Sequence, residues 1–505
     1  MRLFKIKEHK DDASKCIICK NAQSRPAGNL SGSLLSFVCR FVPTWVPQLG
    51  FLDVTIMQQG GKSSFFVILV AASAATAGLI YGYDVSVVNS ALVFLRTAFQ
   101  LGTMATGLVT SMLFWGCAVG ALLGGWGSDR FGRRAVLFSA GAVFCAGALC
   151  AATATHVEQL LAARLLAGVA AGAALLIGPL YIAEVSPASM RGRLVTLNQL
   201  AIVTGILIGF ICNYELAKLA HDNWRWMFAF DLLPSLALCA LLPWIPESPR
   251  WLLQMGHRER AATVLRKITP ENEVDAALAE IGRAIREESG TYRELLSRAL
   301  RRPLVLAVML AIIQQITGVN TVLFYGSILF AEHAGASASQ AIGMNVLVGV
   351  VNLVCTIVGL LLIDRLGRRP LLLTATGGMG ACLLAFAVMM HLLPGRPLLL
   401  LVPVLGYVAC FAFGLGTAVW VCMAELFPNR IRGRAMSIAN LALWIAVSCV
   451  MATFLSLIKM FSASTVFVGY AVICALSFAY IFFALPETKN RTLEEIESLL
   501  AKEKP

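Results

Sequence analysis

Long apolar stretches recur along this chain from Phe65 to Leu485, and short segments rich in charges, prolines or turn residues separate them. A helix needs about 20 apolar residues to cross a bilayer. The stretches reach that length, and they lack the strict alternation of barrel strands. Because only helices and closed barrels satisfy their backbone in lipid, the pattern predicts twelve membrane-spanning helices, at 64–90, 104–126, 135–154, 158–182, 194–216, 226–245, 303–330, 341–363, 370–392, 398–424, 433–457 and 465–485.

The composition excludes a soluble domain of this length. Of the 505 residues, 58% are hydrophobic and only 14% are charged, and the mean hydropathy is +0.76. Soluble domains carry about 25% charged residues. The chain is therefore predicted to be an all-α, multi-pass membrane protein.

Lysine and arginine are distributed unevenly between the predicted loops. Loops on one face, together with the C-terminal tail, hold 26 of the 41 basic residues, and loops on the opposite face hold 5. Since basic loops stay in the cytoplasm, we expect both termini there and the protein in the cell membrane. The net charge of +13 then reflects topology and attraction to anionic membrane lipid, and it requires no nucleic-acid partner.

The chain repeats itself at an offset of about 240 residues. Three pairs of loop signatures come into register: DRFGRR (129–134) with DRLGRR (364–369), EVSPASMRGR (184–193) with ELFPNRIRGR (425–434), and PESPR (246–250) with PETKN (486–490). Because each half holds an even number of helices, both halves run in the same direction. Parallel repeats of this kind place a substrate site near mid-depth between them.

This repeat sets the predicted domain boundaries. Two six-helix halves, 63–246 and 303–486, are joined by a linker, 247–302, whose amphipathic charged segments predict short cytoplasmic helices. An N-terminal extension, 1–62, lacks a clean span and a signal-peptide cleavage site, and we expect it to be disordered. Residues 487–505 form a cytoplasmic tail. The lone CxxC of Cys16 and Cys19 has no second pair, so we expect no metal site or cofactor.

The loop signatures carry a family resemblance. The paired xRxGRR loops, PESPRWLL, QQITGVN and the PETKNRTLEEIE ending together resemble the sugar porter family of the major facilitator superfamily, over residues 64–500. The resemblance implies the major facilitator fold and transport of a small solute by alternating access.

Helix 7 of the predicted map holds the densest cluster of polar residues within a span. Gln314, Gln315 and Asn320 surround Gly318 in QQITGVN. Amides both donate and accept hydrogen bonds, which suits sugar hydroxyls. A glycine in mid-span breaks the helix and frees backbone groups beside a cavity. The alternative is that these amides only bond neighbouring helices.

The resemblance implies further substrate-binding residues on other helices, and packing is the alternative role for each. These residues are Gln199, Tyr325, Asn352, Trp420 and Trp444.

The sequence departs from the family pattern at three positions close to Tyr325, Trp420 and Trp444. Leu443 stands where relatives carry an amide before the helix 11 tryptophan, Phe324 replaces the first tyrosine of a pair, and Thr417 replaces a proline. The first change affects substrate selectivity. We hypothesise that Asn440, one turn before Leu443 and the repeat mate of Gln199, supplies the missing amide.

Two acids and one base lie well inside predicted spans. Asp84, in GYDVSVVNS, and Asp231 are the acids, and Arg164 is the base. A carboxylate whose pairing with a guanidinium changes with conformation can take up and release a proton. By the resemblance, Asp84 in helix 1 is typical of proton symporters, Arg164 is its partner and Asp231 is a second coupling acid. A permanent structural ion pair is the alternative.

The repeated loops supply candidate gating residues. We expect carboxylates and guanidinium groups of these loops to pair across the two halves and to close the cytoplasmic face when the outer face opens. The candidates are Asp129, Arg133, Arg134, Glu184, Arg191, Glu247 and Arg250 in the first half and Asp364, Arg368, Arg369, Glu425 and Arg432 in the second.

The sequence thus predicts a proton-coupled symporter for a monosaccharide or polyol, working as a monomer. A facilitative uniporter, which would not need Asp84, and a carrier of another small organic solute stay open as alternatives. No nucleophile-and-base arrangement is visible in the sequence, so an enzyme is not expected.

Overall fold

The computed structural model of this chain describes residues 54–187, 190–219, 223–287, 292–297, 300–333, 335–392 and 395–489. By its contacts the chain divides into two units, with the boundary between Ser64 and Phe65. All regular structure among the described residues is helical, and twelve helical stretches within them are long and apolar enough to cross a membrane. The predicted all-α architecture with twelve spans is confirmed.

The first six spans contain seven helices. They are α3 (Val54–Ala98), α4 (Thr103–Phe131), α5 (Arg133–Ala152), α6 (Val157–Val185), α7 (Arg191–Leu216), α8 (Asn223–Phe230) and α9 (Leu232–Leu241). Residues 54–62 are helical, whereas the sequence predicted an extension without regular structure up to 62; the rest of that extension lies outside the described residues. The sixth span is interrupted at Asp231, between α8 and α9.

Short helices connect the halves. They are η3 (Leu242–Trp244), α10 (Pro249–Gln254), α11 (Arg258–Ile268), η4 (Glu271–Glu273), α12 (Val274–Glu287) and α13 (Tyr292–Leu295). The face of α11 made by Ala261, Val264, Leu265 and Ile268 is buried. This agrees with the amphipathic pattern predicted for the linker.

The last six spans follow in the same order. They are α14 (Arg301–Ile316), α15 (Val319–Ile328), η5 (Leu329–His333), α16 (Ala338–Leu366), α17 (Arg368–Leu392), α18 (Pro397–Cys410), η6 (Phe411–Leu415), α19 (Gly416–Glu425), α20 (Asn429–Phe461) and α21 (Ala463–Ala484). Helix 7 breaks at Gly318, as predicted, because this residue adopts a left-handed conformation with φ of +90°. η5 and η6 are single π-helical turns, which frequently occur at functional sites.

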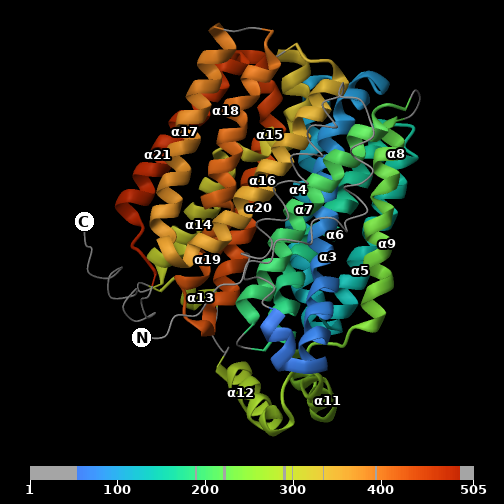
Figure 1. The fold of residues 1–505 in the computed structure, drawn as a ribbon, viewed down its shortest axis with the longest axis vertical. Helices are drawn as coiled ribbons and strands as arrows, with labels where there is room; N and C mark the ends of the chain where they lie inside the picture. Colours follow the sequence, from blue (N-terminus) through green and yellow to red (C-terminus); the bar gives the residue numbers. More distant parts are fainter. Residues whose placement is uncertain are drawn as a thin grey trace, which may run out of the picture. The chain divides into compact units, whose positions relative to one another are not determined.

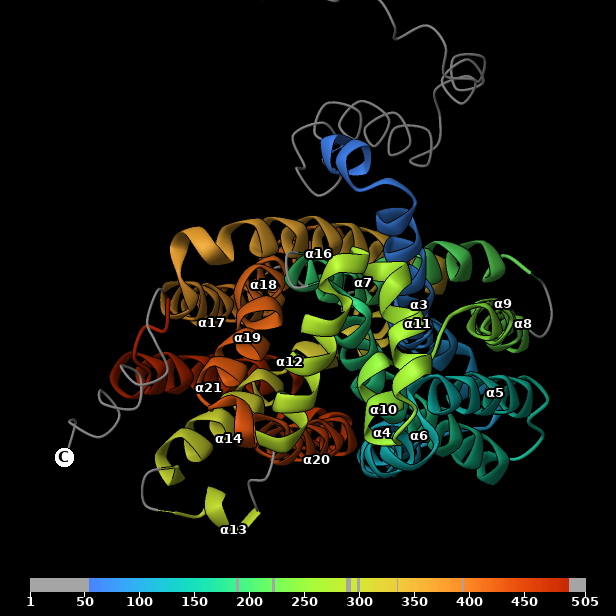
Figure 2. The same cartoon turned by 90° about the horizontal axis from the view of Figure 1, so that it is seen from below.

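The two halves lie side by side. In Figure 1, α3–α9 occupy the right and α14–α21 the left, while α11 and α12 lie below the spans. Figure 2 looks along the bundle from that lower side. We call the end near α10–α12 the linker end and the opposite end of the spans the distal end. The boundary between the halves runs along α3, α4 and α7 on one side and α15, α16 and α20 on the other.

Candidate functional site

The predicted partner of Asp84 is present. The Arg164 guanidinium on α6 donates two hydrogen bonds to the Asp84 carboxylate on α3, Nη1 to Oδ1 at 2.5 Å and Nη2 to Oδ2 at 2.8 Å. Both side chains are only 1% exposed. This fork-to-fork geometry is the strong form of an ion pair, and it explains how a charge is tolerated in the middle of a span.

Asp231 lies near this pair without joining it. Its residue is 2% exposed, and its Oδ1 has no hydrogen-bond partner within the described chain. It lies within electrostatic range of both Asp84 and Arg164. The Nε of Arg164 is also buried and has no hydrogen-bond partner among the described residues. A second carboxyl and a spare guanidinium donor therefore lie beside the closed pair.

The helix 7 amides form one hydrogen-bonded chain. Asn320 Nδ2 donates to Gln315 Oε1 at 2.6 Å, and Gln315 Nε2 donates to Gln314 Oε1 at 3.3 Å. Gln314 Nε2 in turn donates to the Leu415 carbonyl, at 2.9 Å, in the π-helical turn of helix 10. The Asn320 to Gln315 bond spans the break at Gly318. The break thus places amides from α14 and α15 next to each other.

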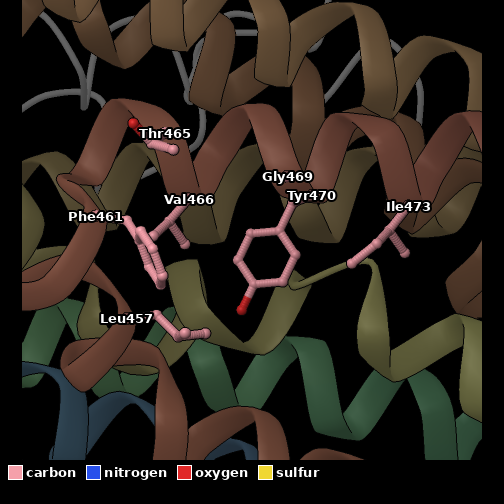
Figure 3. Close-up of a pocket in the computed structure, with 7 residues that line it drawn as sticks. All are labelled: Leu457, Phe461, Thr465, Val466, Gly469, Tyr470 and Ile473. Carbon is pink, nitrogen blue, oxygen red and sulfur yellow. The ribbon is translucent and has the colours of Figure 1, made fainter.

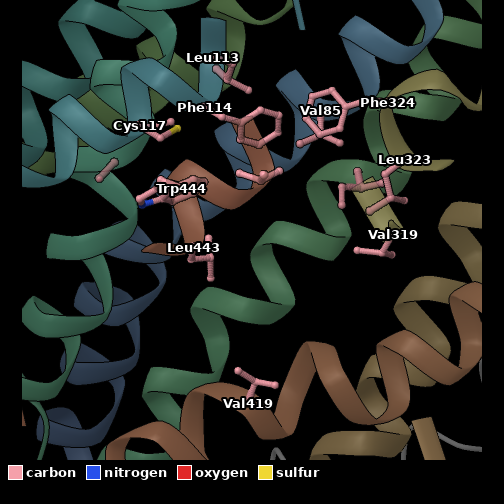
Figure 4. Close-up of a cluster of buried hydrophobic side chains, with 14 of the residues drawn as sticks. Val85, Leu113, Phe114, Cys117, Val319, Leu323, Phe324, Val419, Leu443 and Trp444 are labelled. Carbon is pink, nitrogen blue, oxygen red and sulfur yellow. The ribbon is translucent and has the colours of Figure 1, made fainter. Parts of the chain in front are cut away.

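Trp444 lies at the boundary between the halves. Its ring meets the edge of Tyr81 on α3, with centroids 6.4 Å apart, and stacks near Phe114 on α4 at 6.3 Å. Figure 4 shows Phe114, Phe324 and Trp444 within one apolar cluster, with Leu443 beside the tryptophan. The indole Nε1 of Trp444 is buried and has no partner within the described residues. An unpaired buried donor of this kind suits a polar ligand or a water.

Asn440 carries an unpaired acceptor, whereas Trp444 carries an unpaired donor. Its Oδ1 is buried without a hydrogen-bond partner in the described chain. Leu443, one turn later on α20, is 3% exposed and offers only apolar contact. The hypothesis that Asn440 replaces the missing amide is compatible with this geometry.

Three other predicted residues are not joined to this group by polar contacts. Asn352 is buried, whereas Gln199 and Trp420 are half-buried. No hydrogen bond from these side chains is found among the described residues. Two surface pockets in the described part of the chain lie elsewhere, and neither is lined by a predicted binding residue.

Tyr325, predicted to bind substrate, has its hydroxyl engaged within the protein in this structure. Its side chain is fully buried, and its hydroxyl donates to the Met451 carbonyl at 2.7 Å. The same hydroxyl also bonds Thr110 on α4. Through Thr110 on α4, Tyr325 connects the two halves in this structure.

A buried polar network that the sequence did not predict lies at the distal side. Asn89, on α3, accepts from the Ser327 backbone N–H at 2.9 Å and donates to the Leu323 carbonyl at 2.8 Å. Asn345 on α16 donates to Ser327 Oγ at 3.0 Å. All three polar side chains have no exposed surface. The available signal was an amide within a span, only five residues after Asp84.

Contacts between the halves gather toward the distal end. A Cβ at Gly107 on α4 would meet the Ala452 carbonyl on α20 at 2.7 Å, and one at Gly343 on α16 would meet the Tyr214 ring on α7 at 3.0 Å. Arg96, in the last turn of α3, forms an ion pair with Glu332 in η5. At the linker end, the described residues show no ion pair from one set of six spans to the other. The structure is therefore closed on the distal side.

The loop between α4 and α5 is held by two carboxylates. Glu184 accepts from Arg133 Nε at 3.0 Å and Nη2 at 3.1 Å, and Arg250 lies 3.9 Å from it. Glu247 accepts from the N–H groups of Arg133 and Arg134, at 3.0 and 3.2 Å. Burial raises the pKa of the Glu247 carboxyl, although these backbone donors oppose the rise.

The second half repeats this arrangement. Arg368 Nη2 donates to Glu425 at 2.8 Å, and Glu487 accepts from the N–H groups of Arg368 and Arg369, both at 3.1 Å. Asp129 and Asp364 occupy equivalent positions, 3.5 and 3.2 Å from the arginine four residues later. The repeat seen in the sequence is thus a repeat of contacts.

Pairs between the two halves are expected when the outer face is open, and in this distally closed structure the loops pair within each half. Each carboxylate binds an arginine of its own half, because the loops turn back at Gly132 and Gly367, with φ of +98° and +94°. A Cβ at Gly132 would lie 2.4 Å from the Glu247 carboxylate. Arg191 is exposed and without a charged partner in the described chain, and Arg432 donates to the Phe427 carbonyl.

The chain is similar to known transporters over most of its length. The family model described as "Sugar (and other) transporter" matches residues 70–500. The chain is 33% identical over 458 residues to the arabinose-proton symporter of Bacillus subtilis, covering 89% of this chain and 98% of that one. It is 36% identical over 455 residues to the major myo-inositol transporter IolT of the same bacterium, covering 87% and 95%.

A solved structure shares the fold. The major facilitator superfamily proton:xylose symporter XylE, from E. coli, was solved bound to 6-bromo-6-deoxy-D-glucose. It matches with a TM-score of 0.74 at 32% identity, covering 87% of this chain and 100% of that one.

Proposed function

The chain belongs to the sugar (and other) transporter family and has the major facilitator fold, and from that premise we propose that it is a proton-coupled symporter for a neutral monosaccharide or polyol. The buried ion pair of Asp84 and Arg164 carries the proposal. A carboxylate in mid-span is costly to bury, so it is expected only where it has a function. A uniporter moves no proton and has no use for such a carboxylate. Arabinose, xylose and inositol, named in the relatives, share a neutral polyhydroxyl chemistry.

Protonation of Asp84 changes what Arg164 can bind. A proton on the carboxylate removes the negative charge, so the guanidinium loses its partner in a medium where an unpaired charge is unfavourable. Asp231 interacts electrostatically with Arg164, and its Oδ1 has no hydrogen-bond partner among the described residues. We infer that the proton moves the pairing from Asp84 toward Asp231, and that this exchange distinguishes the loaded from the empty carrier.

The amides of helix 7 supply the substrate-binding groups. Gln314, Gln315 and Asn320 bond each other, so a sugar hydroxyl can replace these bonds without leaving an amide unsatisfied. Trp444 offers an aromatic face and a free N–H, and Asn440 offers a free carbonyl oxygen. Gln199, Asn352 and Trp420 complete the proposed site when the halves close around the substrate.

The loop carboxylates control the linker end. Glu184 and Glu425 keep each loop folded within its own half while the distal end is closed. Rocking of the halves toward the opposite state brings these loops together and allows contacts across the boundary. Proton and substrate bias this equilibrium only through their different affinities for the two states.

The topology that accompanies this function follows from the basic loops. We place the linker end and both termini in the cytoplasm, and we place the halves at 63–246 and 303–486. The protein works as a monomer in this proposal, since each chain holds both halves.

Uptake into proteoliposomes tests the function. Labelled pentose, hexose and inositol are supplied with and without an inward proton gradient, to the wild type and to Asp84→Asn. We expect the gradient to increase uptake of at least one solute in the wild type and to have no effect on the variant. Uptake that is independent of the gradient in both proteins would establish a uniporter. The absence of uptake for every polyhydroxyl solute would refute the proposed substrate class.

A further inference from the structure

A pocket opens between α20 and α21 on the surface of the second half. It has a volume of about 240 Å³ and is lined by Leu457, Phe461, Thr465, Val466, Gly469, Tyr470 and Ile473. Figure 3 shows the Tyr470 ring in the middle of this set, with its hydroxyl directed away from α21. No charged side chain lines the pocket, and its position near the start of α21 places it toward the distal end.

The surroundings of the pocket indicate a hydrocarbon ligand. Phe461, Val468 and Val472 on the same two helices are 55%, 40% and 53% exposed. In a membrane-spanning helix such residues face lipid, so the pocket opens into the acyl chains of the bilayer. A crevice with an apolar lining in that position is filled most favourably by an acyl chain, since an empty void forfeits dispersion contacts.

Tyr470 adds a polar feature to this apolar lining. The residue is 7% exposed, and its hydroxyl has no hydrogen-bond partner among the described residues. Helical side chains lean toward the N-terminus of their helix, which for α21 is the distal end. The hydroxyl therefore leans toward the distal end of α21.

The inner side of Tyr470 contacts functional elements. A Cβ at Gly318, where helix 7 breaks, would lie 3.1 Å from the Tyr470 ring. Tyr470 also stacks near Phe454, with centroids 6.2 Å apart, and Phe454 stacks on Tyr325 at 5.3 Å. Tyr325 bonds Thr110 of the first half. A continuous row of three aromatic rings thus leads from the pocket to a contact that closes the distal side.

We propose that this pocket binds one acyl chain of a membrane phospholipid, and that its occupancy stabilises the distally closed state through Tyr470, Phe454 and Tyr325. A filled pocket holds the Tyr470 ring against Phe454 and the helix 7 break. An empty pocket leaves the ring free to move outward, which loosens the support of Tyr325. Neither step involves the sugar or the proton.

Photolabelling tests the site. The full chain is reconstituted with phosphatidylcholine that carries a diazirine in one acyl chain, and labelled peptides are mapped by mass spectrometry. We expect labelling concentrated in Leu457–Ile473. Gly469→Phe should abolish it, because a Cβ at Gly469 meets no atom within 4 Å and a larger side chain can enter the pocket. Val468→Phe adds the same ring on the neighbouring, exposed residue and should leave labelling unchanged.

Two results would overturn the site. One is labelling spread evenly over all lipid-facing helices. The other is labelling of Leu457–Ile473 that persists in Gly469→Phe. Because no substrate is present, neither result depends on whether the protein transports sugar.

Hydrogen exchange tests the effect of occupancy. The delipidated protein in detergent is compared before and after phosphatidylcholine is added, and exchange is followed in α15. We expect lipid to slow exchange about threefold in the wild type and in Val468→Phe, within the range found for residues that couple two sites. In Gly469→Phe, exchange of α15 should already be slow before lipid is added, and lipid should not slow it further. A lipid effect of equal size in Gly469→Phe would refute the coupling.

Discussion

At the scale of single residues, the ion pair in mid-span is the clearest case of two charges that depend on each other. Arg164 and Asp84 are both 1% exposed and bond through two contacts. We expect Arg164→Leu to destabilise the protein by about 3–5 kcal/mol, because it leaves Asp84 buried without a cation. Combining it with Asp84→Asn should recover most of that loss, since no charge then remains unpaired.

Thermal unfolding of the purified variants in detergent measures this cycle. The single variant Asp84→Asn serves as the matched control, because it leaves Arg164 as the unpaired charge. A double variant as unstable as Arg164→Leu alone would show that the pair contributes through packing and not through charge.

Asn440 allows a second prediction at this scale. Its buried Oδ1 has no hydrogen-bond partner in the part of the chain that the structure describes, so a substrate hydroxyl that bonds it gains an interaction without displacing another. Asn440→Ala should raise the apparent KM for the transported solute by roughly tenfold, as expected for a hydrogen bond worth about 1.4 kcal/mol. Ser437→Ala, an exposed residue one turn earlier whose hydroxyl bonds the Gly433 carbonyl, should leave KM unchanged. Equal KM values for wild type and Asn440→Ala would exclude a binding role.

Single residues also show where sequence reasoning was sufficient. Asp84 and Arg164 could be paired in advance because each is exceptional among apolar neighbours, and a buried charge requires a partner. Asn89 follows the same logic but was missed, since its partners Ser327 and Asn345 lie more than 230 positions away. An amide in a span has many possible partners, and only the packing of the halves selects one.

At the scale of elements, the break in helix 7 controls where the amides point. Gly318 has φ of +90°, and a Cβ there would press on the Tyr470 ring at 3.1 Å. Gly318→Ala should therefore destabilise the protein by about 1–2 kcal/mol from backbone strain alone. The measurement is again thermal unfolding in detergent.

Gly469→Ala is the matched control for this prediction. Gly469 lies within α21, and a Cβ there meets nothing within 4 Å. Alanine is favoured over glycine in a helix by about 0.5–1 kcal/mol, so this variant should be slightly more stable than the wild type. If both alanine variants shifted the unfolding temperature in the same direction, the left-handed conformation of Gly318 would not be the cause.

The sequence predicted elements better than it predicted their partners. Twelve spans and the break at Gly318 depend on local hydropathy and on one glycine, and both are present. The pairing of Glu184 and Glu425 depends on how a loop turns at Gly132 and Gly367 and on which side of the molecule is closed. A repeated motif shows that two loops are alike, and it does not show whether they meet each other.

At the scale of the whole molecule, the two halves are joined mainly toward the distal end, and Asn89 is the centre of that junction. Its amide bonds the Ser327 N–H, the Ser327 hydroxyl and the Leu323 carbonyl, at 2.9, 2.6 and 2.8 Å. Asn89→Ala leaves these buried groups unsatisfied, which costs about 1–3 kcal/mol. That cost applies only while the halves are closed at this end, because an open junction admits water. The distal end should therefore open more often in Asn89→Ala than in the wild type.

Hydrogen exchange of the intact protein, without substrate, measures this opening. Amides of α15 should exchange faster in Asn89→Ala than in the wild type, while those of α5, which lies away from the junction, should not change. Ser90→Ala is the matched control, because Ser90 is the next residue, is fully buried and has a hydroxyl without a partner in the described chain. If exchange of α15 were also faster in Ser90→Ala, the faster exchange in Asn89→Ala would result from general loosening of α3. Unchanged exchange in Asn89→Ala would mean that apolar contacts such as Gly107 with Ala452 are enough to keep the distal end closed.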